Sequence, residues 1–237
     1  MTGLRKSPPT SGRKEYRAVL KRRLGIPANM AETICQAVCD SGLSYEAYVR
    51  TITSSALKEL TTWNQSDLER LLGAARTHGL NPLNREIFMI ANATDAPPLI
   101  AVGVDGWAKI MNAHPQFAGM MFSESTEQAN GIPLWIECEI HRHDRVVPLK
   151  VREYFEESRS EHLAWLTHPR RMLRHKCMVQ CARLAFGLSG IYDTDEALRI
   201  RESGSRPNFS KPHKEHPQGM SELKKGIGRL NEGAPSH

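Results

Sequence analysis

The stretch of the sequence with the clearest chemical character is HPRRMLRHKCMVQCARLAFG, residues 168–187. It carries five lysine or arginine side chains and two histidines, and it contains no aspartate or glutamate. Arginine presents a planar fork of donors that fits a phosphate, and lysine supplies a compact positive charge. Such a cluster predicts the binding of a polyanion, of which nucleic acid is one.

The spacing of the apolar residues in this stretch predicts a helix that is buried on two sides. At 100° per residue, one apolar face holds Leu173, Cys177, Cys181, Leu184 and Leu188. A second apolar face holds Met172, Val179, Ala182 and Phe186. Between the two faces lies a polar strip of Lys176, Gln180, Arg183 and Gly187. We expect this strip to face solvent and to line a groove, with Arg170 and Arg171 at the start of the helix.

An alternative interpretation is that these cations form ion pairs with acids on neighbouring segments. The sequence does not separate this possibility from phosphate binding. We expect Arg174, which points away from the polar strip, to form a structural ion pair. The acids closest in the sequence are Glu153, Glu156, Glu157, Asp193 and Asp195.

Two further groups of side chains could bind a metal ion. Cys35/Cys39 and Cys177/Cys181 are each four residues apart, but no CxxC motif is present, so we expect buried free thiols rather than zinc ligands. A metal-dependent nuclease would have to use acids and histidines from residues 95–144. Residues 139–145, however, predict a surface hairpin. The candidate ligands of such a nuclease are Asp95, Asp105, His141, His143 and Asp144.

Two tryptophans lie close to these motifs. Trp165 comes just before the basic stretch and could either stack on a base or belong to the core. Trp107 follows a DG turn, and we expect it in the core. The chain contains no GxxxxGK[ST] motif, so we expect no nucleotide hydrolysis and no cofactor.

Composition places these motifs in a protein of the cytoplasm. The 237 residues are 40% hydrophobic, and no apolar run approaches the ~18 residues that a membrane span requires. The N-terminus lacks the apolar centre of a secretory signal. Five cysteines, an odd number, argue against a disulfide framework. We therefore expect a location in a reducing cytoplasm and no membrane partner.

The elements that must position the basic helix form an α+β fold. Helical spacing marks residues 30–42, 44–60 and 65–78, with a capping box of Ser66 and Glu69 and a stop at Gly79. Residues 85–92 and 98–104 predict a hairpin, and Asp105 could cap a helix over 106–115. Residues 117–125, 133–142 and 146–155 predict three further strands, giving a small antiparallel sheet with helices.

The charge of the chain is concentrated at its N-terminus. Eight basic residues and one acid lie within residues 1–30, giving +7, so the remaining residues sum to −1 against a net charge of +6. We expect three parts: a basic flexible arm over 1–28, a core over 29–200, and a largely disordered tail over 201–237, which is rich in glycine, proline, serine and charge.

Three segments of the sequence resemble a known family. VGVDGWAKI (102–110), GLNPLNREIF (79–88) and the stretch 168–197 that begins with HPRRMLRHK are similar in order and spacing to the Bet, or Red-beta, branch of the RecT family. These are phage single-strand annealing proteins, and the resemblance covers residues from about 64 to 200.

The resemblance implies a non-enzymatic, ATP-independent protein of homologous recombination. Its members coat single-stranded DNA, assemble into rings or helical filaments, and anneal complementary strands through a duplex intermediate. They work beside a phage 5′–3′ exonuclease and dock a host single-strand-binding protein. Carried over by position, the DNA-binding residues are Arg170, Lys176 and Arg183, with Arg171, Gln180 and Arg85 alongside; we add Trp165 as a stacking candidate.

The resemblance leaves the activity and the docking of partners open. Family members commonly carry a folded C-terminal helical module for their partners, and residues 201–237 are too short and too polar for one. A passive single-strand coat protein would need the same basic groove as an annealing protein. A strand-pairing assay separates the two, because a passive coat would slow pairing.

Overall fold

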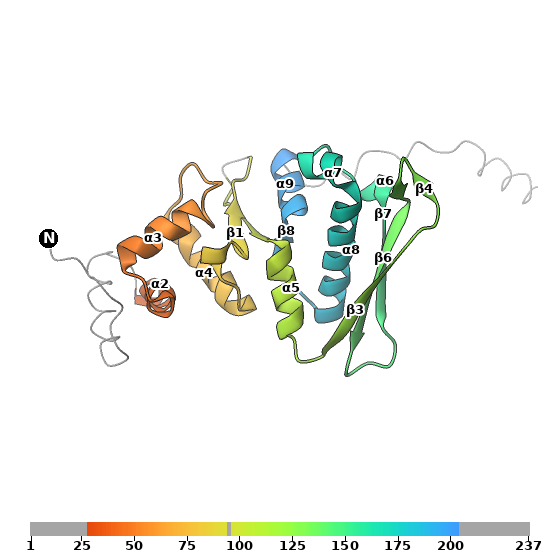
Figure 1. The fold of residues 1–237 in the computed structure, drawn as a ribbon. Helices are drawn as coiled ribbons and strands as arrows, with labels where there is room; N and C mark the ends of the chain where they lie inside the picture. The colour runs from red at the N-terminus through yellow and green to blue at the C-terminus, as the bar shows by residue number, and fades with distance from the viewer. Residues whose placement is uncertain (1–27, 94–95, 204–237) are drawn as a thin grey trace, which may run out of the picture. The chain divides into compact units, whose positions relative to one another are not determined.

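The computed structural model describes residues 28–93 and 96–203, all within one compact unit. This part has the expected mixed α+β fold, with eight α-helices among the described residues (Figure 1). The predicted arm and nearly all of the predicted tail lie outside the described residues. None of the described helices is long and apolar enough to cross a membrane.

The first described helices are α2 (Ala28–Ser41), α3 (Tyr45–Ser54) and α4 (Gln65–His78). The predicted capping box of α4 is wrong, because the box consists of Asn64 and Asp67. Asn64 has an extended backbone and its side chain accepts from the Asp67 amide, while the Asp67 carboxylate accepts from the Asn64 amide. Ser66 instead lies within the first helical turn. Gly79 ends the helix at φ 65°, as expected.

A short 3-10 helix, η2 (Pro82–Asn84), leads into the predicted hairpin of β1 (Ile87–Ile90) and β2 (Leu99–Val102). The two strands pair antiparallel, with Ile87 opposite Val102, which confirms the hairpin. The expectation of a single antiparallel sheet is wrong. β8 (Tyr192–Asp193) pairs in parallel with β2, so that this first sheet is mixed, and a second sheet is separate from it.

Helix α5 (Val104–Ala113) follows β2 directly. Its N-cap is Gly103 and not Asp105, which lies in the first turn, where a negative charge favours the helix dipole. Gly106 packs closely against the hairpin. A Cβ atom at Gly106 would lie 2.2 Å from the Glu86 carbonyl oxygen, so this approach requires glycine.

The second sheet consists of β3 (Phe117–Glu124), β6 (Trp135–Arg142) and β7 (Leu149–Tyr154), the three strands predicted over 117–125, 133–142 and 146–155. All pairs are antiparallel, with β6 in the centre. The turn between β3 and β6 contains a small hairpin of β4 (Gln128–Ala129) and β5 (Ile132–Pro133). On β6, the buried side chains of Ile136, Cys138 and Ile140 alternate with more exposed ones.

The long basic helix is α8 (Pro169–Phe186), which is preceded by α6 (Phe155–Ser158) and α7 (Leu163–Thr167) and followed by β8 and α9 (Thr194–Ser203). It stands between the β3–β6–β7 sheet and the layer of α5, β8 and α9 (Figure 1). Both of its apolar faces are buried, which confirms the two-sided packing. Leu184 is the exception in these faces, since it is 63% exposed.

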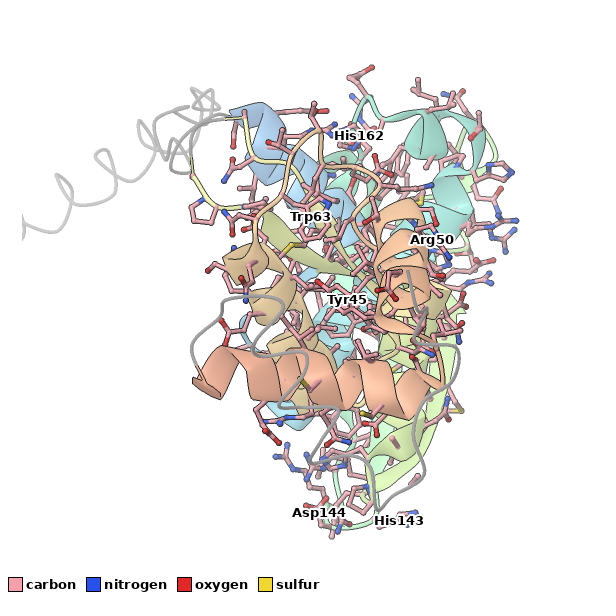
Figure 2. All side chains as sticks on the ribbon, turned by 90° about the vertical axis from the view of Figure 1, so that its left-hand side faces the viewer. Tyr45, Arg50, Trp63, His143, Asp144 and His162 are labelled. Atoms are coloured by element: carbon pink, nitrogen blue, oxygen red, sulfur yellow. The ribbon has the colours of Figure 1, made fainter. Side chains whose placement is uncertain are left out.

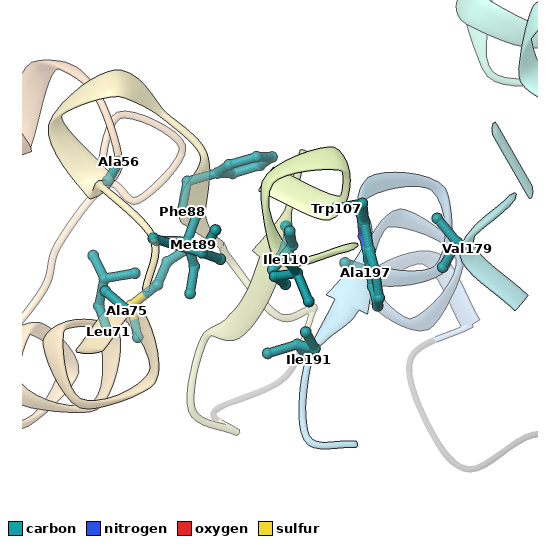
Figure 3. Packing of buried hydrophobic residues seen from close by; sticks show 14 of the residues in the cluster. Ala56, Leu71, Ala75, Phe88, Met89, Trp107, Ile110, Val179, Ile191 and Ala197 are labelled. Carbon is teal, nitrogen blue, oxygen red and sulfur yellow. The ribbon is translucent and has the colours of Figure 1, made fainter. Parts of the chain in front are cut away.

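The hydrophobic core runs continuously from α4 to α8. Leu71 and Ala75 of α4 pack near Met89 of β1, and the row continues through Trp107 of α5 to Val179 of α8 (Figure 3). Cys138, Cys177 and Cys181 are buried free thiols, as expected. Cys177 and Cys181 point from α8 toward carbonyl oxygens of the second sheet, and burial raises the pKa of the Cys177 thiol to about 12. The Cys177 thiol is therefore structural, because a raised pKa keeps it protonated.

Candidate nucleic-acid interface

Helix α8 presents its cations on two opposite sides. Pro169 occupies its first turn, where the missing amide hydrogen costs no helical bond, and Gly187 ends it at φ 65°. One polar side faces β8 and α9, and the other lies beside β3. The two sides differ in what packs against them.

On the side of β8 and α9, Lys176 is enclosed by acids. Its Nζ lies 3.2 Å from Asp193 Oδ2 and 3.6 Å from Asp195 Oδ2, and its side chain is only 14% exposed. The expectation that the polar strip faces solvent is therefore wrong. The chain turns back after Gly187, and this turn brings the acids of β8 and α9 against α8.

Arg183 is held in the same way. Its Nη2 donates to Glu196 Oε2 and to the Ile191 carbonyl oxygen, both at 2.6 Å. Its guanidinium also lies 5.6 Å from the centre of the Trp107 ring. Trp107 is 1% exposed, which confirms its expected place in the core. Gln180, between these cations on the strip, is half-buried.

Asp195 is the centre of the network on this side. The Trp165 indole donates to Asp195 Oδ1 at 2.7 Å, and Arg199 Nε donates to Oδ2 at 2.8 Å. Burial on its own raises the pKa of Asp195, but the Trp165 hydrogen bond and the charges of Arg199 and Lys176 outweigh it and lower that pKa. The network ties α7, α8 and α9 together.

Trp165 itself is 3% exposed, so its ring packs within the core. The placement matches the second of the two interpretations offered for this residue. Stacking on a base would require the indole to leave Asp195. Arg85 is also engaged locally: it donates to the Ser55 carbonyl oxygen at 2.8 Å and to Glu59 at 3.0 Å.

On the other side of α8, the cations are open to solvent. Arg170, Arg171 and Arg174 are all exposed. Arg170 donates to Glu124 of β3 in a pair whose two side chains are 50% and 34% exposed. Among residues 28–93 and 96–203, neither Arg171 nor Arg174 has an acid partner. On α8, these two are the cations that no acid of the described residues compensates.

The prediction of a structural ion pair for Arg174 is wrong. Its guanidinium instead lies 5.8 Å from the centre of the Phe122 ring on β3. The reason is its angular position, which directs Arg174 toward the edge strand and away from the acids of α9. Phe122 was not singled out from the sequence, because Met120, Met121 and Phe122 are consecutive apolar residues and give no alternation that marks one side of the sheet.

His175 lies between the two sides, and its pKa responds to the exposed cations. Burial lowers its pKa, and the charges of Arg171 and Arg174 lower it further, against smaller opposing effects of Asp105 and Asp193. The neutral form is therefore favoured while no anion is bound. An anion held by the two arginines would oppose this shift.

The histidines and acids proposed as metal ligands do not gather at one place. His143 and Asp144 lie at the tip between β6 and β7 (Figure 2), and Asp144 accepts from Arg142 at 2.6 Å. His141 pairs with Glu139, Asp105 is on α5, and Asp95 lies outside the described residues. Within the described part of the chain, no group of three or more potential ligands could hold a metal ion.

Comparison with known proteins assigns the chain to a family. The RecT family matches residues 48–212, more than half of the sequence, and the chain belongs to that family. Among curated proteins, the recombination protein bet of Escherichia phage lambda is 37% identical over 188 residues, which cover 74% of this chain and 67% of that protein. The resemblance noted in the sequence is thereby confirmed.

Proposed function

We propose that this protein binds single-stranded DNA and anneals complementary strands in phage-type homologous recombination without hydrolysing a nucleotide. Membership of the RecT family and similarity to a phage recombination protein support this function. The structural observation that carries it is the pair of exposed arginines on α8, Arg171 and Arg174, for which the described residues supply no acid partner. Such cations attract phosphate whatever the base sequence.

Annealing needs cations that neutralise phosphate while the Watson–Crick edges stay accessible. Two single strands repel each other, and base stacking in the product supplies about 1.4 kcal/mol per step once that repulsion is screened. Arginines that contact only the backbone provide the screening. The reaction then needs no energy source and no cofactor.

Arg170 joins the two free arginines in this proposal. Its pair with Glu124 is solvent-exposed, and such pairs contribute about 0–1 kcal/mol, so a phosphate can replace the carboxylate at little cost. For Lys176, Gln180 and Arg183, contact with DNA stays a prediction. Lys176 would have to exchange its buried acid partners for a phosphate, and Arg183 would have to give up the half-buried Glu196. Contact of Arg85 or Trp165 with DNA would similarly require the loss of a structural hydrogen bond.

We further propose that the protein acts as a homo-oligomer, in a ring or helical filament, and receives its strand from a phage 5′–3′ exonuclease. An oligomer holds a strand extended over many protomers, which a single chain of 26.6 kDa cannot do. A host single-strand-binding protein is a further proposed partner. Mass measurement on DNA complexes tests the assembly, and a strictly monomeric profile would contradict it.

The deciding experiment measures, by fluorescence energy transfer and in the absence of ATP, how fast two complementary labelled oligonucleotides pair. The protein should accelerate pairing above the spontaneous rate, and R171A/R174A should lose most of that acceleration. A passive coat protein would slow pairing instead. Incubation of labelled DNA with Mg²⁺ or Mn²⁺ in the same buffer tests for nuclease activity, which would appear as shortened products.

A further inference from the structure

Phe122 is an aromatic residue on the edge of the second sheet that the core does not use. It lies opposite Cys138, a buried residue of β6, so its side chain points to the face that α8 covers. Because β3 is an edge strand, the ring is nevertheless 38% exposed. Phe117 and Met120 of the same strand pack against the core cluster, whereas Phe122 does not belong to it.

The ring lies beside exposed cations along one line of contact, the β3–α8 seam, which consists of Phe122, Glu124, Arg170 and Arg174. Arg174 lies 5.8 Å from the Phe122 ring centre, and Arg170 pairs with Glu124. Four residues of a helix rise about 6 Å and two residues of a strand about 6.8 Å. The spacing of Arg170 and Arg174 along α8 therefore matches that of Glu124 and Phe122 along β3. The seam thus brings one aromatic ring together with two arginines, of which Arg170 is paired with Glu124, at one surface.

The contact between Arg174 and the ring does not by itself account for this exposed phenylalanine. A cation about 6 Å from a ring centre is at the limit of a favourable interaction, and an exposed one interacts weakly. Burial does not account for it either, since more than a third of the residue is accessible. A planar ligand, in contrast, can cover the exposed ring while its charged groups meet the arginines.

We propose that Phe122 is a base-stacking residue, which holds a nucleobase of single-stranded DNA while Arg171 and Arg174 contact the adjacent phosphates. This inference rests on the proposed function and names a residue that it did not include. Stacking uses the face of a base and leaves its Watson–Crick edge free for a second strand. Because every base has such a face, the contact is independent of sequence.

The test uses the full-length protein and compares its affinity for an oligonucleotide that has bases with its affinity for one that lacks them. Affinity is measured by fluorescence anisotropy at one salt concentration for an oligothymidine and for an abasic oligonucleotide of equal length. The wild type should bind the oligothymidine about 5- to 140-fold more tightly, which corresponds to about 1–3 kcal/mol for one stacked base. Phe122→Leu, which keeps an apolar side chain without the ring, should bring this ratio close to one.

Two further variants make the result specific. Phe122→Trp should retain the wild-type ratio, because it restores a stacking surface. Tyr154→Leu removes another exposed aromatic, 45% exposed at the end of β7, and should leave the ratio unchanged. The slope of log affinity against log salt should be the same for Phe122→Leu and wild type, since no charge is removed.

The possible outcomes separate this inference from the proposed function. A wild type that binds both oligonucleotides equally well, or Phe122→Leu with the wild-type ratio, would overturn the stacking role and leave DNA binding intact. A wild type that binds neither oligonucleotide would overturn the proposed function. If Phe122→Leu lost its cooperative thermal unfolding, the wild-type ratio and Phe122→Trp would still decide the question.

Discussion

The two polar sides of α8 carry the same kinds of side chain but meet different neighbours. On the side of β8 and α9, Lys176 and Arg183 are 14% and 21% exposed and pair with acids. On the side of β3, Arg171 and Arg174 are exposed and have no acid partner within the described residues. The positive charge of one helix is therefore divided between a structural network and a solvent-exposed surface.

The difference shows that the function of a cation depends on the segment packed against it. The acids that enclose Lys176 belong to 193–196, which only the turn after Gly187 brings back to α8. Loss of one partner of a buried ion pair strongly destabilises the folded protein, whereas an exposed cation can be removed at little cost to folding. The two sides should therefore respond in opposite ways to substitution.

The largest expected effect is on stability, at the centre of the network. Asp195→Ala would leave Lys176, Arg199 and the Trp165 indole without their common partner, and should lower the free energy of unfolding by about 3–5 kcal/mol. Urea denaturation followed by circular dichroism measures this. Glu124→Ala, which breaks the exposed pair with Arg170, is the matched control and should cost about 0–1 kcal/mol. Equal losses for both variants would remove the distinction between the two sides.

A smaller effect is expected on DNA binding when the exposed acid is neutralised. Glu124→Gln frees Arg170 and removes a negative charge from the β3–α8 seam, so single-stranded DNA should bind more tightly. One additional phosphate contact steepens the slope of log affinity against log salt by about 0.7. Asp193→Asn is the control on the other side, because the amide oxygen can still cap α9 by accepting from the Glu196 amide. A steeper slope for Asp193→Asn would show that Lys176 also reaches DNA.

The smallest expected effect is a change in the pKa of His175, which NMR titration of the ring can follow. Burial first, and then Arg171 and Arg174, hold this pKa below 6.5. A pKa lowered by folding gives stability that is complete above 6.5 and declines as the pH falls through that value toward the folded pKa. R171A/R174A should raise the pKa, and bound DNA should raise it in the wild type only. An unchanged pKa on DNA binding would place the phosphates elsewhere.

Local patterns predicted much of the fold, because they depend on neighbouring residues. Strand-like segments bounded by turn residues located β3, β6 and β7 and the β1–β2 hairpin, and helical spacing revealed that α8 is buried on two sides. The capping box was misplaced by two residues because Asn64 and Ser66 both satisfy the pattern. Backbone geometry alone selects Asn64.

The site was harder to predict, because its geometry depends on contacts between distant segments. Spacing placed Lys176, Gln180 and Arg183 on one strip correctly, but it could not show that β8 and α9 cover that strip. The same spacing assigned Arg174 to an ion pair and overlooked Phe122, since the edge position of β3 follows only from the order of strands in the sheet. Contacts between segments that are distant in the sequence determine both what covers the polar strip and which strand lies at the edge of the sheet.

The most direct test of this division is the salt dependence of single-stranded DNA binding by two double variants. For R171A/R174A, the slope of log affinity against log salt should become shallower by about 1.4, so that a fourfold rise in salt weakens binding about seven-fold less than in the wild type. Its unfolding should be unchanged. K176Q/R183Q should lose stability and should keep a wild-type slope in its folded fraction. A wild-type slope for R171A/R174A, with a reduced slope for K176Q/R183Q, would show that DNA binds on the side of β8 and α9.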